Sequence, residues 1–174
     1  SLFPKVSAKG VVIMDRKSKV VLFSKNPDLR FAPASTSKIM TALVALDHYQ
    51  LSDILEVFEN SDPFSPVEFK KGEKIAFEDL LFAMMLPSSN DAASIIAKNY
   101  PGGEKAFVEK MNERALELSL KNTHFEEPVG LLDTKNYTTP KDLALLSSFA
   151  MSNETFRKIV VTKDKIIYDA NGQN

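Results

Sequence analysis

Two runs of strand-forming residues open the chain. Positions 10–14 and 19–23 are rich in apolar and β-branched side chains, and they flank a polar segment at 15–18. Paired runs around a short polar segment are typical of a β-hairpin. The Asn-Pro-Asp string at 26–28 then ends the second run, because these residues favour turns.

Helical spacing dominates the middle of the chain. Apolar side chains cover nearly the whole circumference of the segment that begins at about Ser35, which is typical of a helix buried in the centre of a domain. Positions 88–91 hold four residues that favour helix N-termini, and Thr139 is followed by a proline, which is common at the first helical position. We therefore predict helices at about 35–49, 77–85, 88–99, 104–118 and 139–151.

Strand signals return near the C-terminus. The stretch 51–76 is mixed and contains Pro63, Pro66 and Gly72, which predicts loops with short strands. The pairs and triplets at 160–161 and 166–168 are β-branched or aromatic and predict a final strand or hairpin. The expected fold is therefore a helical middle with a thin sheet supplied by the two ends.

The composition limits the class of protein. The 174 residues are 44% hydrophobic and 26% charged, which is enough for one domain with a sizeable core and unlike a disordered chain. The formal net charge of -1 gives no positive excess that would favour nucleic acid as a partner. No apolar run approaches the roughly 18 residues of a membrane span, so we expect any membrane anchor to lie outside this chain.

Cysteine is absent, and the histidines are His48 and His124 alone. These counts exclude disulfides, a thiol nucleophile and a cysteine metal site, and we expect neither a metal ion nor another cofactor. The first residues lack the charged-then-apolar pattern of a signal peptide. Either the protein acts in the cytoplasm, or a signal peptide was removed before residue 1.

The string Ser35-Thr36-Ser37-Lys38 is the first candidate for chemistry. A serine hydroxyl needs a base to become a nucleophile, and a lysine can be that base if burial makes it neutral. Positions i and i+3 share one face of a helix, so Ser35 and Lys38 can touch there. Chance alone predicts roughly 1.7 such matches in a chain of this composition, so the string by itself also fits a helix cap beside a solvated lysine.

Ser88-Ser89-Asn90 is the second candidate, because a hydroxyl can relay a proton and an amide can hold a substrate carbonyl or a lysine. The same spacing occurs at Ser24 and Asn26, and plain helix capping or a turn would also explain these residues. Neither short motif assigns a function alone.

Longer strings surround these motifs. They are Pro33-Ala34-Ser35-Thr36-Ser37-Lys38-Ile39-Met40-Thr41, Leu86-Pro87-Ser88-Ser89-Asn90-Asp91-Ala92-Ala93, and the segments 72–75, 78–81, 121–125, 137–144 and 156–160. Together they resemble the D-alanyl-D-alanine carboxypeptidases, which are low-molecular-mass penicillin-binding proteins. The resemblance covers nearly the whole chain, in the family's order.

The resemblance implies an α/β (α+β) fold of the β-lactamase and D,D-peptidase type, in which helices back an antiparallel sheet and form a helical subdomain. It implies an extracytoplasmic serine peptidase, with its signal peptide removed, that cleaves the terminal D-Ala from peptidoglycan stem peptides. Ser35 would form the acyl-enzyme and Lys38 would be the base. Ser88 would pass the proton to the leaving amine, and Asn90 would bind the substrate or Lys38. β-Lactam antibiotics would inhibit the enzyme by trapping Ser35.

The sequence departs from the family pattern at the third motif, because it contains no Lys-Thr-Gly string. In the family this motif lies on a later strand and supplies a cation for the substrate carboxylate and part of the oxyanion hole. We therefore expect residues 1–174 to form a single catalytic domain that is incomplete at its C-terminal side, with an incomplete sheet. A smaller departure is the segment 126–130, where the family more often has Asn-Pro-His-Gly.

Other functions stay open at this point. A β-lactamase of the same superfamily would need a carboxylate that activates water, and Glu126 or Glu127 could be proposed for that role. The same two residues would suggest the paired acids of glycoside hydrolysis, although adjacent side chains usually point in different directions. The chain could also be a non-catalytic binding or structural module, which the missing third motif favours.

Overall fold

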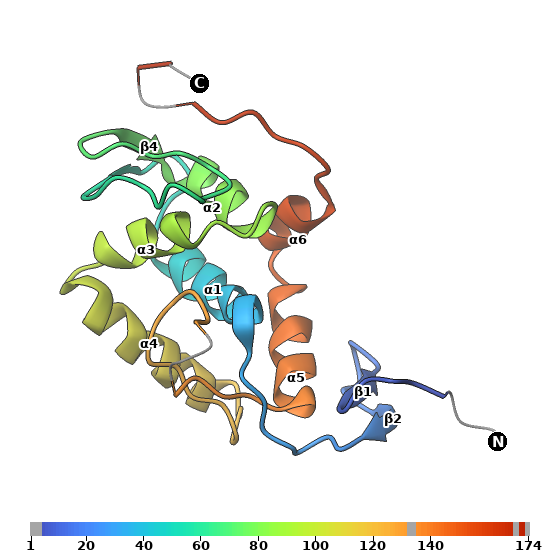
Figure 1. Ribbon diagram of the computed structural model, residues 1–174. Helices are drawn as coiled ribbons and strands as arrows, with labels where there is room; N and C mark the ends of the chain where they lie inside the picture. Colours follow the sequence, from blue (N-terminus) through green and yellow to red (C-terminus); the bar gives the residue numbers. More distant parts are fainter. Residues whose placement is uncertain (1–4, 132–134, 169–170, 173–174) are drawn as a thin grey trace.

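The computed structural model describes residues 5–131, 135–168 and 171–172. Figure 1 shows a helical part with the N-terminal hairpin beside it. In chain order the elements are β1 (Val11–Met14), β2 (Val21–Lys25), the 3-10 helix η1 (Ala34–Ser37), α1 (Lys38–His48), β3 (Ile54–Glu56), β4 (Lys74–Ala76), α2 (Phe77–Met85), α3 (Asn90–Lys98), α4 (Gly103–Glu117), α5 (Pro140–Ala150) and α6 (Glu154–Val161).

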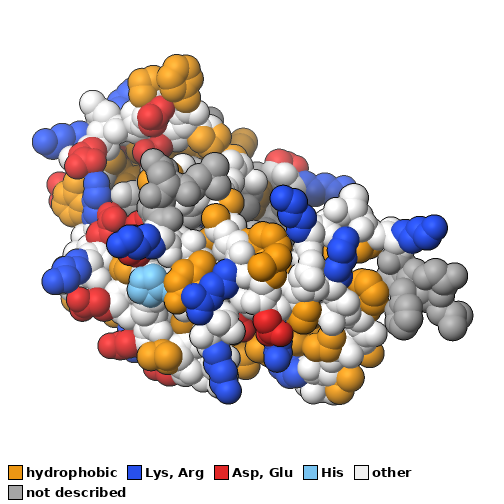
Figure 2. Space-filling model, turned by 60° about the horizontal axis from the view of Figure 1, so that its bottom comes forward, with side chains coloured by type: hydrophobic (Ala, Val, Ile, Leu, Met, Phe, Trp, Pro, Cys, Tyr) orange, Lys and Arg blue, Asp and Glu red, His pale blue; other side chains and the backbone are white. Residues whose placement is uncertain are grey.

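The two N-terminal strands form the predicted hairpin. β1 and β2 pair antiparallel, with Val12 opposite Ser24. The second strand begins later than predicted because Lys19, with a φ of 61°, still belongs to the turn. β1 packs against α5, whereas Val20 and Leu22 of the hairpin are 54% and 66% exposed. In the space-filling view, apolar side chains are visible on the side of the molecule that carries the hairpin (Figure 2).

α1 lies at the centre of the helical part, as its apolar circumference predicts (Figure 1). It packs against α2, α3, α4 and α5. The buried side chains of its middle are Met40, Thr41, Ala42, Leu43, Val44 and Ala45. Because α1 is surrounded on several sides, any polar group that it carries inward must find its partners inside the protein.

The helices predicted in the middle of the chain are confirmed as α2 to α5, with their ends within about three residues of the expected positions. Local capping fixes two of the starts. The Ser89 hydroxyl accepts a hydrogen bond from the backbone N–H of Ala92 at 3.2 Å, and the Thr139 hydroxyl accepts one from Asp142 at 3.1 Å. Pro140 follows the second cap at the first helical position.

Short strands occur in the stretch 51–76, as predicted. β3 and β4 pair antiparallel, and Leu55 lies opposite Ile75 with both side chains buried. The two-stranded sheets and the surrounding helices together give the mixed architecture that the sequence predicts. Within the described part of the chain, no helix has the length and apolar content that crossing a membrane requires.

The prediction of a final strand or hairpin at 160–161 and 166–168 is wrong. Val160 and Val161 end helix α6, and residues 162–168 form no regular element. The Asn153 side chain caps α6 by accepting the N–H of Phe156 at 3.0 Å. Phe156 and Ile159 are buried on a helix that packs against α2, so tertiary packing outweighs the strand preference of the valine pair.

Candidate active site

A buried lysine is the centre of the candidate site. Lys38, in the first turn of α1, is only 2% exposed. Its Nζ lies 3.3 Å from the hydroxyl oxygens of both Ser35 and Ser88. The same nitrogen donates to Asn90 Oδ1 at 2.7 Å and to the backbone carbonyl of Val129 at 3.2 Å. The four residues selected from the sequence therefore meet at one point.

The two hydroxyls sit where a ligand can reach them. Ser35 and Asn90 are exposed and Ser88 is partly exposed, while the amine beneath them is covered. Ser35 lies in η1, one turn before Lys38, which is the spacing that predicts their contact. Ala34, just before Ser35, and Ser88 itself have left-handed backbones with φ of 48° and 64°. Such a backbone costs a residue other than glycine about 1–3 kcal/mol, and here it flanks or carries the two hydroxyls.

Capping explains why Ser88 and Asn90 are free to bind the lysine. Of the four cap-forming residues at 88–91, Ser89 alone supplies the cap hydrogen bond of α3. Ser88 lies before the cap and Asn90 is the first helical residue, and both side chains contact Lys38. The competing serine and asparagine pair belongs to the end of the hairpin, where the Asn26 amide donates to the carbonyl of Lys9 in a turn.

Burial sets the electrostatics of the amine. Because desolvation penalises the charged form, it lowers the pKa of Lys38 below its ordinary value, and the Glu127 carboxylate opposes part of that shift. The lowered pKa favours a neutral amine at a lower pH than an exposed lysine would allow. A neutral amine is the form that can accept a proton from a serine hydroxyl.

The hydrogen-bond partners also match a neutral amine. Such an amine has two N–H donors and one lone pair, whereas a protonated lysine has three donors and no lone pair. The Asn90 and Val129 oxygens can only accept, so they match the two donors. The lone pair remains for a hydroxyl proton, and Ser35 and Ser88 are both within reach.

The sequence did not indicate the contribution of the loop at 126–131. The carbonyl of Val129 contacts Lys38, and the carbonyl of Pro128 accepts a hydrogen bond from the buried Thr41 hydroxyl at 2.6 Å. A backbone acceptor leaves no residue-type signal in a sequence. The available signal was Gly130, which lies two residues after Pro128 and has a φ of 89° that glycine alone tolerates readily.

Glu126 and Glu127 do not form a pair of facing acids. The Glu127 carboxylate accepts hydrogen bonds from the backbone N–H groups of its own loop. Glu126 is exposed, and its carboxylate accepts the N–H of Lys135 at 3.2 Å. The arrangement that the glycoside interpretation needs is therefore not formed by these residues.

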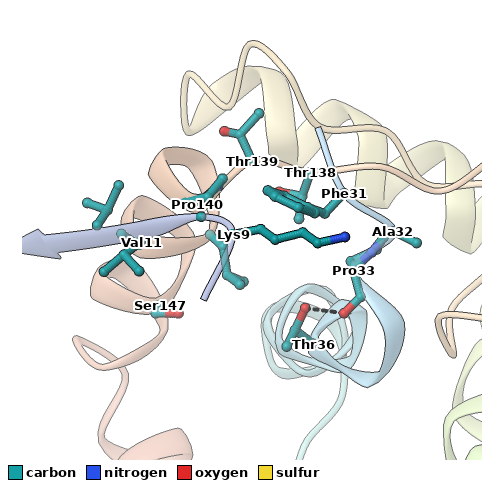
Figure 3. A pocket seen from close by; sticks show the side chains of 14 residues that line it. Lys9, Val11, Phe31, Ala32, Pro33, Thr36, Thr138, Thr139, Pro140 and Ser147 are labelled. Carbon is teal, nitrogen blue, oxygen red and sulfur yellow. Dashed lines mark hydrogen bonds between the residues drawn. The ribbon is translucent and has the colours of Figure 1, made fainter. Parts of the chain in front are cut away.

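A groove of about 540 Å³ lies between β1 and α5 (Figure 3). It adjoins residues 33–36, the segment that carries the candidate nucleophile Ser35 and is called the nucleophile segment below. Val11 of β1 and Pro140 of α5 both line it, and the side chain of Lys9 runs across it (Figure 3). The Thr36 hydroxyl points to the Pro33 carbonyl at 2.5 Å along its edge. Thr36 follows Ser35 in the chain. The groove is nevertheless separate from the lysine cluster, because its lining includes none of the four residues of that cluster, which are Ser35, Lys38, Ser88 and Asn90.

A metal centre finds no support in the part of the chain that the structure describes. No three His, Cys, Asp or Glu side chains gather there in a way that could hold a metal ion.

Comparison with known proteins gives a consistent result. The family described as D-alanyl-D-alanine carboxypeptidase matches residues 2–171. The chain is 36% identical over 174 residues to the D-alanyl-D-alanine carboxypeptidase of Streptomyces sp. (strain K15), covering 92% of this chain and 60% of that protein. It is 35% identical over 162 residues to the D-alanyl-D-alanine carboxypeptidase DacF of Bacillus subtilis, covering 89% of this chain and 42% of that protein.

A solved structure of a mutant Streptomyces K15 DD-transpeptidase superposes on the chain with a TM-score of 0.87. The two share 33% sequence identity, and the match covers 98% of this chain and 72% of that one. The similarity confirms the expected fold class. The chain spans about half the length of the curated relatives it matches.

Proposed function

This chain belongs to the D-alanyl-D-alanine carboxypeptidase family, and we propose that it removes the terminal D-Ala from peptidoglycan stem peptides through an acyl-enzyme on Ser35. The observation that carries the proposal is the contact between the Ser35 hydroxyl and the amine of a lysine that is 2% exposed. Burial favours the neutral form of this amine, which is the base that a serine nucleophile requires.

The first half of the reaction forms the acyl-enzyme. The neutral amine of Lys38 takes the proton of the Ser35 hydroxyl as its oxygen attacks the carbonyl carbon of the penultimate D-Ala. The resulting tetrahedral intermediate collapses when the C–N bond breaks. The proton now on Lys38 passes through the Ser88 hydroxyl to the departing amine, because Ser88 lies 3.3 Å from the same Nζ. Free D-Ala leaves and an ester remains on Ser35.

The second half returns the enzyme to its starting state. Lys38, neutral again, takes a proton from a water molecule that attacks the ester carbonyl. The ester bond breaks and Ser35 recovers its proton, which releases the shortened peptide. Asn90 holds Lys38 through its carbonyl oxygen, which leaves its amide N–H₂ able to donate to the substrate peptide. A β-lactam would follow the first half, with its strained amide opened by Ser35.

The family consists of cell-wall peptidases, so an extracytoplasmic location fits the proposed substrate. Peptidoglycan stem peptides are exposed on the outer side of the cytoplasmic membrane. Penicillins mimic the D-Ala-D-Ala terminus and are expected inhibitors. The formal net charge of -1 gives no reason to add nucleic acid to these partners.

Intact-mass spectrometry after incubation with benzylpenicillin tests the proposal. The 174-residue chain should gain one penicillin adduct, which peptide mapping should place on Ser35. Ser35→Ala should gain none. Ser37→Ala is the matched control, because Ser37 is a buried serine in the same string with no hydrogen-bond partner for its hydroxyl among the described residues, and it should still be labelled.

The other outcomes of this experiment separate the alternatives. A chain with a native circular dichroism spectrum and no adduct would contradict the proposal and favour a non-catalytic module. Continued penicillin turnover, with no D-Ala released from a D-Ala-D-Ala peptide, would favour a β-lactamase. Rapid release of D-Ala from that peptide would support the carboxypeptidase directly.

A second pair of variants tests which serine and asparagine motif acts. Ser88→Ala should slow adduct formation about 100-fold, because it removes a proton relay. Ser24→Ala alters the same spacing in the hairpin and should label at the rate of the unmodified chain. Equal rates for the two variants would remove Ser88 from the mechanism.

A further inference from the structure

The Glu127 carboxylate sits in a cradle of hydrogen-bond donors. It accepts the backbone N–H of Val129 at 2.7 Å, of Gly130 at 2.8 Å and of Leu131 at 2.8 Å. The side-chain amide of Asn136 is a further donor to the same carboxylate. A carboxylate offers about four lone-pair positions, so these donors occupy it. Glu127 therefore has little acceptor capacity left for activating a water molecule.

The turn built around this carboxylate is pressed against the nucleophile segment. Its carbonyls point to α1, since Val129 O contacts the Lys38 amine and Pro128 O contacts the Thr41 hydroxyl. A Cβ added at Gly130 would lie 1.8 Å from the carbonyl oxygen of Ala34, just before Ser35. At Gly130 there is therefore no room for a side chain between the turn and the segment that carries Ser35.

Among the described residues, Glu127 also acts on the amine through its charge. Burial lowers the pKa of Lys38, and the Glu127 charge raises it. The other elements around the amine contribute Ser35 from η1 and Ser88 and Asn90 from the start of α3, which carry no charge. The carboxylate thus acts on Lys38 through the shape of the loop and through its charge.

We propose that Glu127 is a positioning residue for the acylation by Ser35. Its carboxylate folds the 127–131 turn so that the carbonyl of Val129 holds the Lys38 amine beside Ser35. The role rests on the proposed function, but its physical content, a link between Glu127 and Lys38, can be measured without catalysis.

Titration of the Lys38 side chain by NMR measures this link. The chain is labelled with ¹³C-lysine, and the Lys38 signal is assigned as the one that disappears in Lys38→Met. In Glu127→Gln the midpoint of the Lys38 titration should move to lower pH, because the charge that favours the protonated amine is gone. Glu126→Gln is the matched control. It removes the charge of the neighbouring, exposed glutamate and should leave the midpoint where it is.

Two further variants keep the test decisive if Glu127→Gln folds poorly. Asparagine can accept an N–H two residues on, so Glu127→Asn should keep the turn without the charge and should also lower the midpoint. Glu127→Asp keeps the charge, and its midpoint should stay near that of the unmodified chain. A midpoint in the folded neutral variants that is unchanged, or that moves to higher pH, overturns the proposal.

The rate of penicillin labelling gives the second readout. At a pH where Lys38 is neutral, Glu127→Gln should label about 10- to 100-fold more slowly, since a misplaced catalytic group costs that much. Glu126→Gln should match the unmodified chain, and a matching rate for Glu127→Gln would contradict the positioning role. If the unmodified chain is not labelled at all, the proposed function fails, while the NMR titration still decides whether Glu127 acts on Lys38.

Discussion

The lysine cluster and the N-terminal hairpin are built in opposite ways. Around Lys38, an ionisable side chain is buried, and its nitrogen has four hydrogen-bonding oxygen atoms within 3.3 Å. On the hairpin, apolar side chains such as Leu22 stay 66% exposed to solvent. Leaving a buried polar group without its partners costs free energy, whereas an exposed apolar side chain contributes little to folding. The site should therefore tolerate far less change than the hairpin.

The largest expected difference between the two regions comes from adding one methyl group. Gly130→Ala places a Cβ 1.8 Å from the backbone oxygen of Ala34 at a φ of 89°, so both backbone strain and a clash oppose it. We expect it to lower the free energy of unfolding by about 4 kcal/mol and to abolish penicillin labelling. Gly10→Ala, beside the hairpin, meets side-chain atoms of Pro140 and Phe31 at 2.7 and 2.8 Å.

The alanine at position 10 should therefore cost less, about 1–2 kcal/mol, because side chains shift more easily than backbone. Urea denaturation measures both values, and labelling with penicillin should persist in Gly10→Ala. Equal losses of stability in the two variants would mean that the turn at 127–131 is free to move away from the Ala34 carbonyl.

Core truncations should show the same contrast at a smaller scale. Leu81, in α2, is fully buried, so Leu81→Ala should lower the free energy of unfolding by about 3 kcal/mol through lost burial and a residual cavity. Leu22→Ala should change it by no more than about 0.5 kcal/mol, since that side chain is mostly exposed. The midpoint of urea denaturation measures both, and a large effect of Leu22→Ala would show that the hairpin is part of the core.

Local signals in the sequence predicted most of the helices and the N-terminal hairpin. The apolar circumference of α1, the cap at Thr139 and the polar turn of the hairpin place their elements to within about three residues. The strand preference of Val160 and Val161 was misleading, because the decisive contacts of α6 are made by the residues before them against α2. Such contacts between distant segments have no local signature.

The candidate site, like the fold, could be predicted from the sequence only in part. Ser35 and Lys38 could be paired from their spacing on one helical turn, and Ser88 and Asn90 from the family resemblance. The carbonyl of Val129 and the cradle around Glu127 could not, because backbone atoms carry no residue-type signal and the cradle exists only once the loop is folded. The sequence showed that the loop was unusual at these positions, but not what it does.

The smallest expected effect is a change in stability with pH that belongs to the lysine cluster alone. The pKa of Lys38 is lowered from its ordinary value of 10.5, chiefly by burial. Below the folded-state pKa, the folded and unfolded chains both hold the proton, so pH changes nothing. Between the folded-state pKa and 10.5, the unfolded chain holds a proton that the folded chain has released, so the free energy of unfolding must rise with pH.

Lys38→Met removes the titrating amine, and with it the rise of the free energy of unfolding with pH in this window. The stability of the unmodified chain minus that of Lys38→Met should therefore increase with pH across this window, by no more than about 1.4 kcal/mol per pH unit, and level off near 10.5. Urea denaturation at a series of pH values measures the difference. Leu22→Ala, which changes no titratable group, should show none of this slope. A flat or falling difference for Lys38→Met would mean that burial does not favour the neutral amine, and Ser35 would then lack its base.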